Sequence, residues 1–157
     1  MSKITPFLWF DNNAEEAMNF YVSIFKNSKI VSMQRIENAG PSRKETVVTG
    51  TFELDGQRFM VLQAGPLFKF TEAISMFVDC ETQEEVDYFW EKLTVGGSES
   101  QCGWLKDKFG LSWQIVPKAL GQMLGDKDPA KSKRVMGAML QMRKIEVAKL
   151  LEAWEGK

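Results

Sequence analysis

Apolar and polar residues alternate along the first part of the chain with two different periods, one typical of strands and one typical of a helix. Aromatic and β-branched residues gather in residues 3–10, whereas from Ala14 to Phe25 apolar residues recur every three or four positions. Asn13 and Glu16 resemble a capping box at the start of this helix. The predicted elements are a strand, a helix and three further strands, over residues 3–10, 14–25, 29–36, 45–54 and 58–63. Together they predict one βαβββ module over about residues 1–66.

The same order of elements recurs in the second half of the chain. Thr82 and Glu85 form another capping box, in front of a helix whose apolar residues are Val86, Phe89, Trp90 and Leu93. Strands are predicted before and after this helix, over residues 72–80, 99–106 and 111–116. Two copies of the same order indicate an internal duplication and an α+β fold, with the second βαβββ module over about residues 70–118.

Beyond Pro117 the pattern becomes helical. A short helical turn ends at Gly125, and Asp128 followed by Pro129 predicts a new helix start. Apolar residues at helical spacing then predict one or two amphipathic helices, so that residues 119–157 form a C-terminal helical extension. We interpret the many basic residues here as a solvated helix face, because glutamates are interspersed among them at positions 146, 152 and 155. The whole chain, residues 1–157, is predicted to be a single domain.

The composition argues against several classes of protein. The 157 residues carry 20 Lys and Arg against 21 Asp and Glu, so the chain offers no basic field for nucleic acid. No apolar run is long enough to cross a bilayer, and the first residues do not resemble a secretory signal. Two cysteines cannot form a framework of several disulfides. A cytoplasmic protein with reduced thiols is therefore the expectation.

The chain contains no histidine, which excludes Ser-His-Asp and Cys-His catalysis as well as histidine-ligated metal sites. The remaining candidates for catalysis are Asp79 at a strand end, Lys106 beside Trp104, and Cys80 in front of a helix. The alternative interpretation is that the aspartate forms a turn or cap and the cysteine is an ordinary strand residue. Because neither a phosphate-binding loop nor a dinucleotide motif is present, no cofactor is predicted.

Two glutamines stand out because each interrupts an apolar strand. Gln63 ends Met-Val-Leu-Gln, and Gln114 follows Ser-Trp, and we match these two positions between the modules. A buried amide without partners costs roughly 1–3 kcal/mol, so each must form hydrogen bonds. The partner is either neighbouring backbone or a ligand in a shared cavity, and the sequence leaves both alternatives open.

Several long motifs resemble one known family. They are Pro-Phe-Leu-Trp-Phe-Asp at residues 6–11, Ile-Ser-Met-Phe-Val-Asp-Cys at 74–80, the run from Cys102 to Pro117, and the methionine-rich segment 134–145. Over nearly the whole chain the sequence resembles the PhnB-like family of the vicinal oxygen chelate superfamily, which includes glyoxalase, bleomycin-resistance and dioxygenase proteins. Members of this family carry the label 3-demethylubiquinone-9 3-methyltransferase.

The resemblance implies a fold in which two βαβββ modules form a cup-shaped mixed sheet. The superfamily's metal-ligand positions fall near Pro6, Gln63, Ala73 and Gln114, none of which is ionisable. We therefore expect no metal, since neutral amides compete poorly for divalent transition metals.

Strand alternation then predicts a ligand-binding lining for the cup. The predicted lining residues are Leu8, Phe10, Val61, Gln63, Ser75, Phe77, Trp104 and Gln114.

Three functions follow as hypotheses. The first is a metal-free homodimer that binds a small organic molecule in the cup, as in bleomycin-resistance proteins. The second is an enzyme of the family, acting on a quinone-like substrate through Asp79, Lys106 or Cys80, although no motif for S-adenosylmethionine is recognisable. The third is a structural or regulatory homodimer whose C-terminal helices supply the partner surface.

Overall fold

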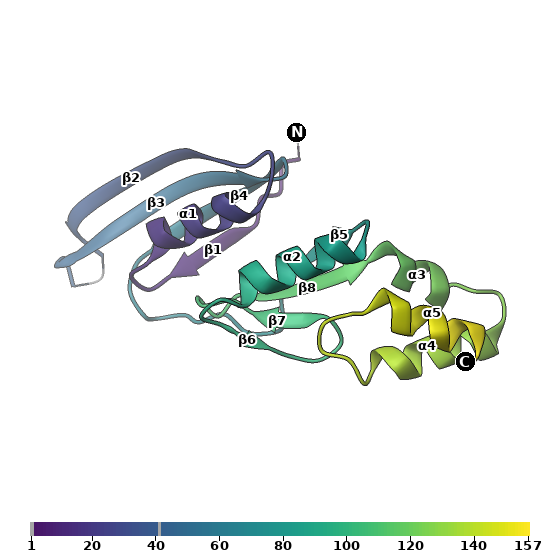
Figure 1. Cartoon of the computed structure of the whole chain (residues 1–157). Helices are drawn as coiled ribbons and strands as arrows, with labels where there is room; N and C mark the ends of the chain where they lie inside the picture. The colour runs from purple at the N-terminus through teal and green to yellow at the C-terminus, as the bar shows by residue number, and fades with distance from the viewer. Residues whose placement is uncertain (1, 41) are drawn as a thin grey trace. The chain divides into compact units, whose positions relative to one another are not determined.

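The computed structural model of the chain describes residues 2–40 and 42–157, and it divides into two compact units (Figure 1). Unit one covers residues 1–70 and unit two covers residues 71–157. The division follows the two predicted modules, and the C-terminal extension belongs to unit two. Each unit contains one four-stranded mixed sheet, which confirms the predicted α+β class.

Unit one has the predicted order of elements. They are β1 (Phe7–Phe10), α1 (Ala14–Ile24), β2 (Lys29–Ala39), β3 (Glu45–Leu54) and β4 (Gln57–Gln63). In the sheet the strands lie in the order β1-β4-β3-β2, with β1 parallel to β4 and the other pairs antiparallel. The first strand is shorter than predicted and begins after Pro6, which has no N–H to donate to a neighbouring strand.

Helix α1 covers one face of this sheet. Its buried residues are Ala14, Ala17, Met18, Tyr21 and Ile24. Along β3 every second residue is buried, including Gly50 and Phe52. A Cβ atom on Gly50 would lie only 3.0 Å from the side chain of Met18, so this face of β3 is pressed against α1.

Unit two repeats the arrangement. Its first elements are β5 (Ser75–Cys80), α2 (Gln83–Thr94), β6 (Ser98–Glu99), β7 (Trp104–Lys106) and β8 (Ser112–Pro117). The strands lie in the order β5-β8-β7-β6, with β5 parallel to β8. The predicted cap of α2 is confirmed, because the hydroxyl of Thr82 accepts a hydrogen bond of 3.2 Å from the N–H of Glu85.

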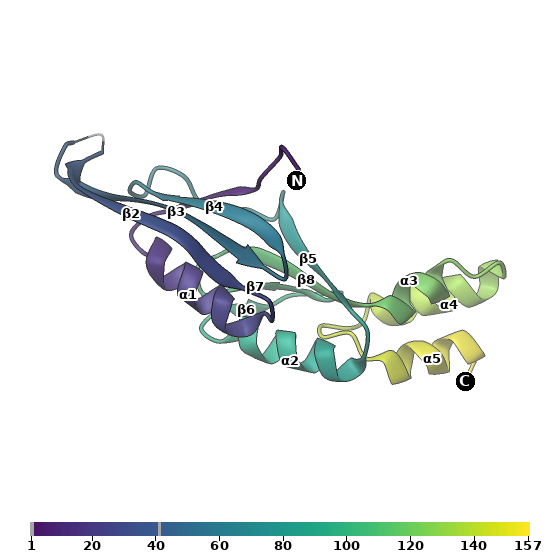
Figure 2. The same ribbon diagram turned by 90° about the horizontal axis from the view of Figure 1, so that it is seen from above.

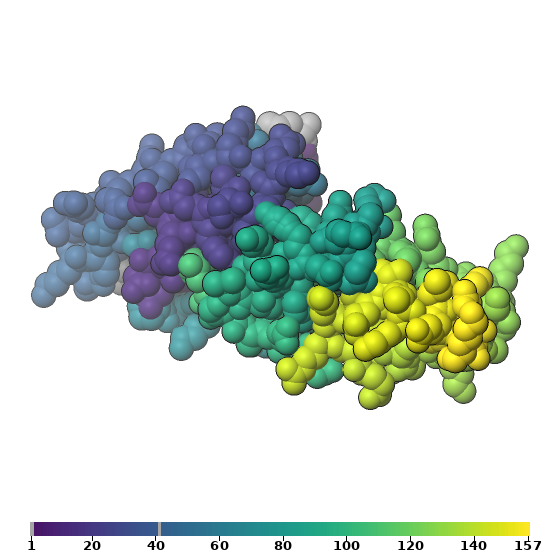
Figure 3. All heavy atoms as spheres, viewed as in Figure 1, coloured from purple at the N-terminus to yellow at the C-terminus, as the bar shows by residue number. Residues whose placement is uncertain are grey.

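Three further helices complete unit two: α3 (Lys118–Leu124), α4 (Pro129–Met139) and α5 (Val147–Glu155). They lie together beyond the carboxyl end of β8 and form one lobe of the unit (Figures 2 and 3). None of the helices in the described chain combines the length and the apolar run that a membrane span needs.

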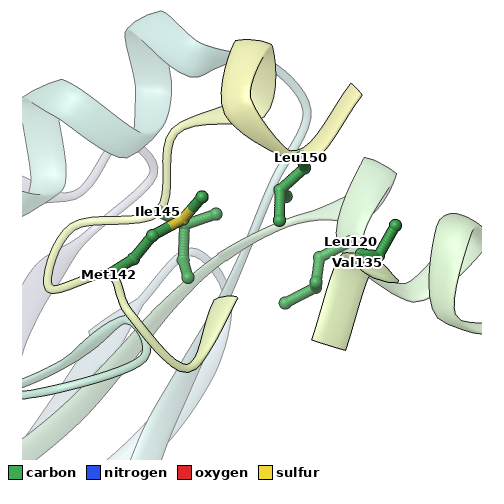
Figure 4. Packing of buried hydrophobic residues seen from close by; sticks show 5 residues of the cluster. All are labelled: Leu120, Val135, Met142, Ile145 and Leu150. Atoms are coloured by element: carbon green, nitrogen blue, oxygen red, sulfur yellow. The ribbon is translucent and has the colours of Figure 1, made fainter. Parts of the chain in front are cut away.

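A small apolar core holds this lobe together (Figure 4). Its buried members are Leu120, Val135, Met142, Ile145 and Leu150. Met142 and Ile145 belong to the segment between α4 and α5, and the predicted helical stretch is interrupted there.

One side chain ties the lobe to α2. The amide of Gln83 donates a hydrogen bond of 3.0 Å to the carbonyl of Ile145, and its oxygen accepts one of 2.7 Å from the N–H of Val147. Because Val147 is the first residue of α5, Gln83 supplies the cap for a helix whose own N-cap residue forms no side-chain cap bond in the described chain.

Candidate functional site

The sheet of unit two has one face covered by α2 and one face without a helix. Leu105, Trp113 and Ile115 are buried, and their positions alternate with those of Trp104, Lys106, Ser112 and Gln114. Since successive side chains point to opposite faces, the buried set packs toward α2 and the alternate set lies on the other side. We call this second side the helix-free face of unit two.

Pairing between strands places the residues of this face in two rows. Gln114 on β8 is paired with Phe77 on β5 and with Trp104 on β7, and we call these three residues the aromatic row. Two residues along the strands lies the polar row, which consists of Ser75, Ser112, Lys106 and Ser98 on β5, β8, β7 and β6. The structure thus brings together Ser75, Phe77, Trp104 and Gln114, four of the eight predicted lining residues.

A hydrogen bond joins the two rows. The side-chain nitrogen of Gln114 donates to the hydroxyl of Ser75 over 2.9 Å. Beside this pair, on the edge strand β5, the large apolar side chain of Phe77 keeps 58% of its surface exposed. The amide is therefore oriented by a polar neighbour and flanked by an open aromatic surface.

Next to the rows lies a cavity of about 250 Å³. It is lined by Glu72, Ser98, Glu99, Ser100, Trp104, Leu105, Lys106 and Ser112. Ser112 is only 1% exposed, and its hydroxyl has no hydrogen-bond partner among the described residues. Lys106 forms an ion pair with Glu72, and this ammonium group lowers the pKa of the Glu72 carboxyl.

The turn that follows Lys106 is held by a buried carboxylate. One oxygen of Asp107 accepts hydrogen bonds from the N–H groups of Phe109 and Leu111, at 2.9 and 3.0 Å, and the other accepts one of 2.9 Å from the indole of Trp113. Asp107 is 3% exposed. Asp107 thus fixes the turn and holds the end of β7, where Lys106 lies, in place.

The four predicted lining residues of unit one lie elsewhere. Leu8, Phe10 and Val61 are buried, and Val61 is paired with Gly50, which is pressed against α1. The side-chain oxygen of Gln63 accepts a hydrogen bond of 3.1 Å from the N–H of Ala14, the first residue of α1. These four side chains therefore pack beneath α1 rather than on an open face, and we leave them out of the site.

The three candidates for catalysis do not form one centre. Lys106 belongs to the polar row, whereas Asp79 lies 3.6 Å from Lys118 at the far end of β5. Cys80 is fully buried on the side of α2, and burial raises the pKa of its thiol to about 12, with further contributions from the charges of Glu85 and Asp79. Its thiol is therefore protonated at neutral pH and is a poor nucleophile.

The metal-ligand positions implied by the resemblance do not fit a metal. Pro6 and Ala73 have no donor atom in their side chains, the amide of Gln63 caps α1, and that of Gln114 binds Ser75. Across residues 2–40 and 42–157, no group of three or more Cys, Asp and Glu side chains is placed to hold a metal ion.

Several residues of the site were not predicted from the sequence, and three of them carry polar groups next to Lys106. Ser98 and Ser112 complete the polar row, and Glu72 faces Lys106 across the cavity. Ser112 was detectable, because it lies two positions before Gln114 in the same strand and so shares its face. Ser98 and Glu72 depend on pairing with distant parts of the chain.

Comparisons with known proteins identify relatives of this chain. The family model described as 3-demethylubiquinone-9 3-methyltransferase matches residues 2–116. A PhnB protein from Bacillus cereus, named as a candidate for that methyltransferase, is 44% identical, and the match covers 74% of this chain and 99% of that one with a TM-score of 0.67. A search of curated proteins found no match.

More distant structures share the fold. A protein from Pseudomonas aeruginosa is 17% identical over 74% of this chain and 98% of its own, with a TM-score of 0.63. The fosfomycin resistance protein FosX from Listeria monocytogenes, solved with Mn(II) and sulfate, is 15% identical over 72% of this chain and 89% of its own, with a TM-score of 0.50. These likenesses confirm the predicted fold of two βαβββ modules.

Proposed function

Because the chain belongs to the PhnB-like, 3-demethylubiquinone-9 3-methyltransferase family of the vicinal oxygen chelate superfamily, whose members share this fold, we propose that unit two binds a small organic molecule on its helix-free face. The observation that carries the proposal is the hydrogen-bonded pair of Gln114 and Ser75, flanked by Phe77 and Trp104 in the same sheet. Small-molecule sites combine apolar and aromatic walls with a few polar groups, and this face has both.

The chemistry of the face favours binding through shape and hydrogen bonds. Gln114 offers a neutral amide, and Phe77 offers an exposed ring. FosX is described with Mn(II), whereas the metal-ligand positions that the resemblance implies for this chain, near Pro6, Gln63, Ala73 and Gln114, do not fit a metal ion. Methyl transfer, which the family name suggests, needs a bound methyl donor, and the sequence contains no recognisable motif for S-adenosylmethionine.

Binding is preferred over catalysis because the candidates for catalysis are separated. The Cys80 thiol is protonated at neutral pH, and Asp79 is paired with Lys118 away from the rows. A catalytic role would require turnover that disappears when Lys106 alone is replaced, because Lys106 is the candidate that lies at the site.

Thermal unfolding in the presence of a library of small aromatic compounds tests the proposal. We expect at least one compound to raise the Tm, and we expect Gln114→Ala and Phe77→Ala to reduce that rise. Gln63→Ala is the matched control, since it removes the same amide from beneath α1 and should lower the baseline Tm while keeping the rise. A rise that is unchanged in both site variants would contradict the proposal.

We further propose that the protein is a homodimer. Phe7 and Met60 on the face of unit one opposite α1 are 53% and 39% exposed, which is apolar surface of the kind that subunit interfaces cover. Sedimentation velocity measures the assembly state directly, and a monomer at all concentrations would contradict this proposal.

A further inference from the structure

We infer that the cavity beside the polar row binds the anionic group of the ligand, so that the preferred ligand class is a planar aromatic molecule carrying a carboxylate. The inference rests on the proposed function, because it assigns a ligand class to the same face. It adds Ser112, Lys106 and Glu72 as the residues that decide between an acid and its neutral analogue.

Hydrogen-bond donors converge on this cavity. The hydroxyl of Ser112 is buried and unpartnered in the described chain, although a buried hydroxyl normally finds a partner. Lys106 on β7 is paired with Ser112, and its ammonium group is a charged donor. On the other side of Lys106, Ser98 on β6 is paired with it. Two donor groups beside one another match the oxygens of a carboxylate, which accept from charged donors more strongly than neutral oxygens do.

Glu72 occupies the place of such a carboxylate. Its side chain is 59% exposed and that of Lys106 is 42% exposed, so the ion pair between them is largely in water and contributes little. A ligand carboxylate can therefore take over Lys106 at small cost and gain the hydroxyl of Ser112 as well. The ligand must displace Glu72 from Lys106 in order to bind, so a neutral residue at position 72 should raise the affinity for the acid.

The second carboxylate of the cavity is already engaged. One oxygen of Glu99 accepts a hydrogen bond of 2.6 Å from the indole of Trp90, and the other lies 3.7 Å from Arg143. Glu99 also follows Ser98 along β6 and so points to the opposite side of the strand. Its charge is compensated away from Lys106 and does not repel an incoming acid strongly.

The spacing of the sheet fits a ring with an acidic substituent. Phe77 and Trp104 lie on strands two apart, which corresponds to about 9.6 Å between backbones. A ring between them would have each neighbouring centroid at about 4.5–7 Å, the usual distance of aromatic pairs. The cavity of about 250 Å³ is smaller than the roughly 300–1,000 Å³ of a site for a whole ligand, so it suits one substituent.

The test uses 2-naphthoate and 2-naphthamide, which have the same ring system and differ in charge. Isothermal titration at neutral pH with the full chain should give a Kd for the acid that is lower than that of the amide by about tenfold, as expected for hydrogen bonds to a charged group. Lys106→Met and Ser112→Ala should each reduce this ratio toward one. Glu72→Gln should increase the affinity for the acid and leave that for the amide unchanged.

The outcomes separate this inference from the proposed function. If both probes bind equally and Gln114→Ala weakens both, the face binds aromatic molecules but the acidic class is wrong. If neither probe binds while a neutral compound raises the Tm in a manner that depends on Gln114, the inference again fails alone. If no compound binds at all, both proposals fail. Ser112→Ala is a small change and Glu72→Gln is on the surface, so we expect both variants to fold. Their Tm values test this.

Discussion

Gln63 and Gln114 lie on the last strands of two sheets with the same strand order, and each is paired with a phenylalanine on the parallel neighbouring strand. The environments of these two pairs are nevertheless opposite. Phe10, the partner of Gln63, is 3% exposed beneath α1, whereas Phe77, the partner of Gln114, is 58% exposed on the helix-free face. The two glutamines thus each have a phenylalanine on the parallel strand, but they lie on different faces of their sheets.

The difference between the two glutamines follows from an offset of one residue in the match between their strands. Side chains alternate with a period of two, so matching two strands by their letters with a shift of one residue exchanges the two faces. The apparent match between Gln63 and Gln114 contains such a shift. The duplicated fold is real, but the two amides have different functions, one as a helix cap and one as a candidate ligand contact.

The largest expected effect separates the two phenylalanines. Phe10→Ala removes a buried ring beneath α1 and should lower the free energy of unfolding by about 3–5 kcal/mol. Phe77→Ala removes an exposed ring and should cost less than about 1 kcal/mol. Urea unfolding of both variants measures the difference. Equal losses would mean that the faces are not distinguished as described.

Replacing the glutamine of unit one should also lower the free energy of unfolding more than replacing that of unit two, but both losses should be smaller than for Phe10. Gln63→Ala leaves the buried N–H of Ala14 without its partner and should cost about 1–3 kcal/mol. Gln114→Ala frees the hydroxyl of Ser75, which is part-buried and can turn to water, so a loss below about 1 kcal/mol is expected. A Gln114→Ala variant that is the less stable of the two would reverse this comparison.

The helix starts give a third contrast. Thr82→Ala removes a side-chain cap from α2 and should cost about 1 kcal/mol. Asn13→Ala should cost only a few tenths of a kcal/mol, because within the described chain the Asn13 side chain forms no cap bond to α1. Thermal unfolding of the two variants, scanned under identical conditions, measures both values. A large loss in Asn13→Ala would show that α1 is capped locally after all.

The smallest effect at neutral pH concerns Cys80. Its pKa is raised from 9.0 to about 12 in the folded protein, so the stability that the buried thiol contributes is fully present below about pH 9 and is lost as the pH rises through 12. The free energy of unfolding should therefore decline less steeply between pH 9 and 12 in Cys80→Ala than in the parent. Urea unfolding of both proteins at steps across this pH range measures the two slopes, and equal slopes would contradict the prediction.

Local signals in the sequence were enough to predict most elements of the fold. Thr82 predicted its own helix start, and the apolar spacing predicted one or two C-terminal helices without placing the break between α4 and α5. The predicted lining included residues of both units, whereas the candidate site contains only those of unit two. Gln63 interrupts an apolar strand as a ligand contact would, but its partner is the N–H of Ala14, 49 residues earlier, and no local pattern records that contact. Which face a helix covers is likewise decided by tertiary packing.

Gln83 connects the C-terminal extension to the part of the chain that the family model matches. The family model ends at Val116, yet the side chain of Gln83, well inside the matched region, is bonded on both sides to the segment that leads into α5. A chain that stopped after β8 would leave that amide without both partners and would uncover Val116, which packs against the core of the lobe. The lobe is consequently not an independent appendage, because Gln83 of α2 and the segment that leads into α5 complete each other's hydrogen bonds.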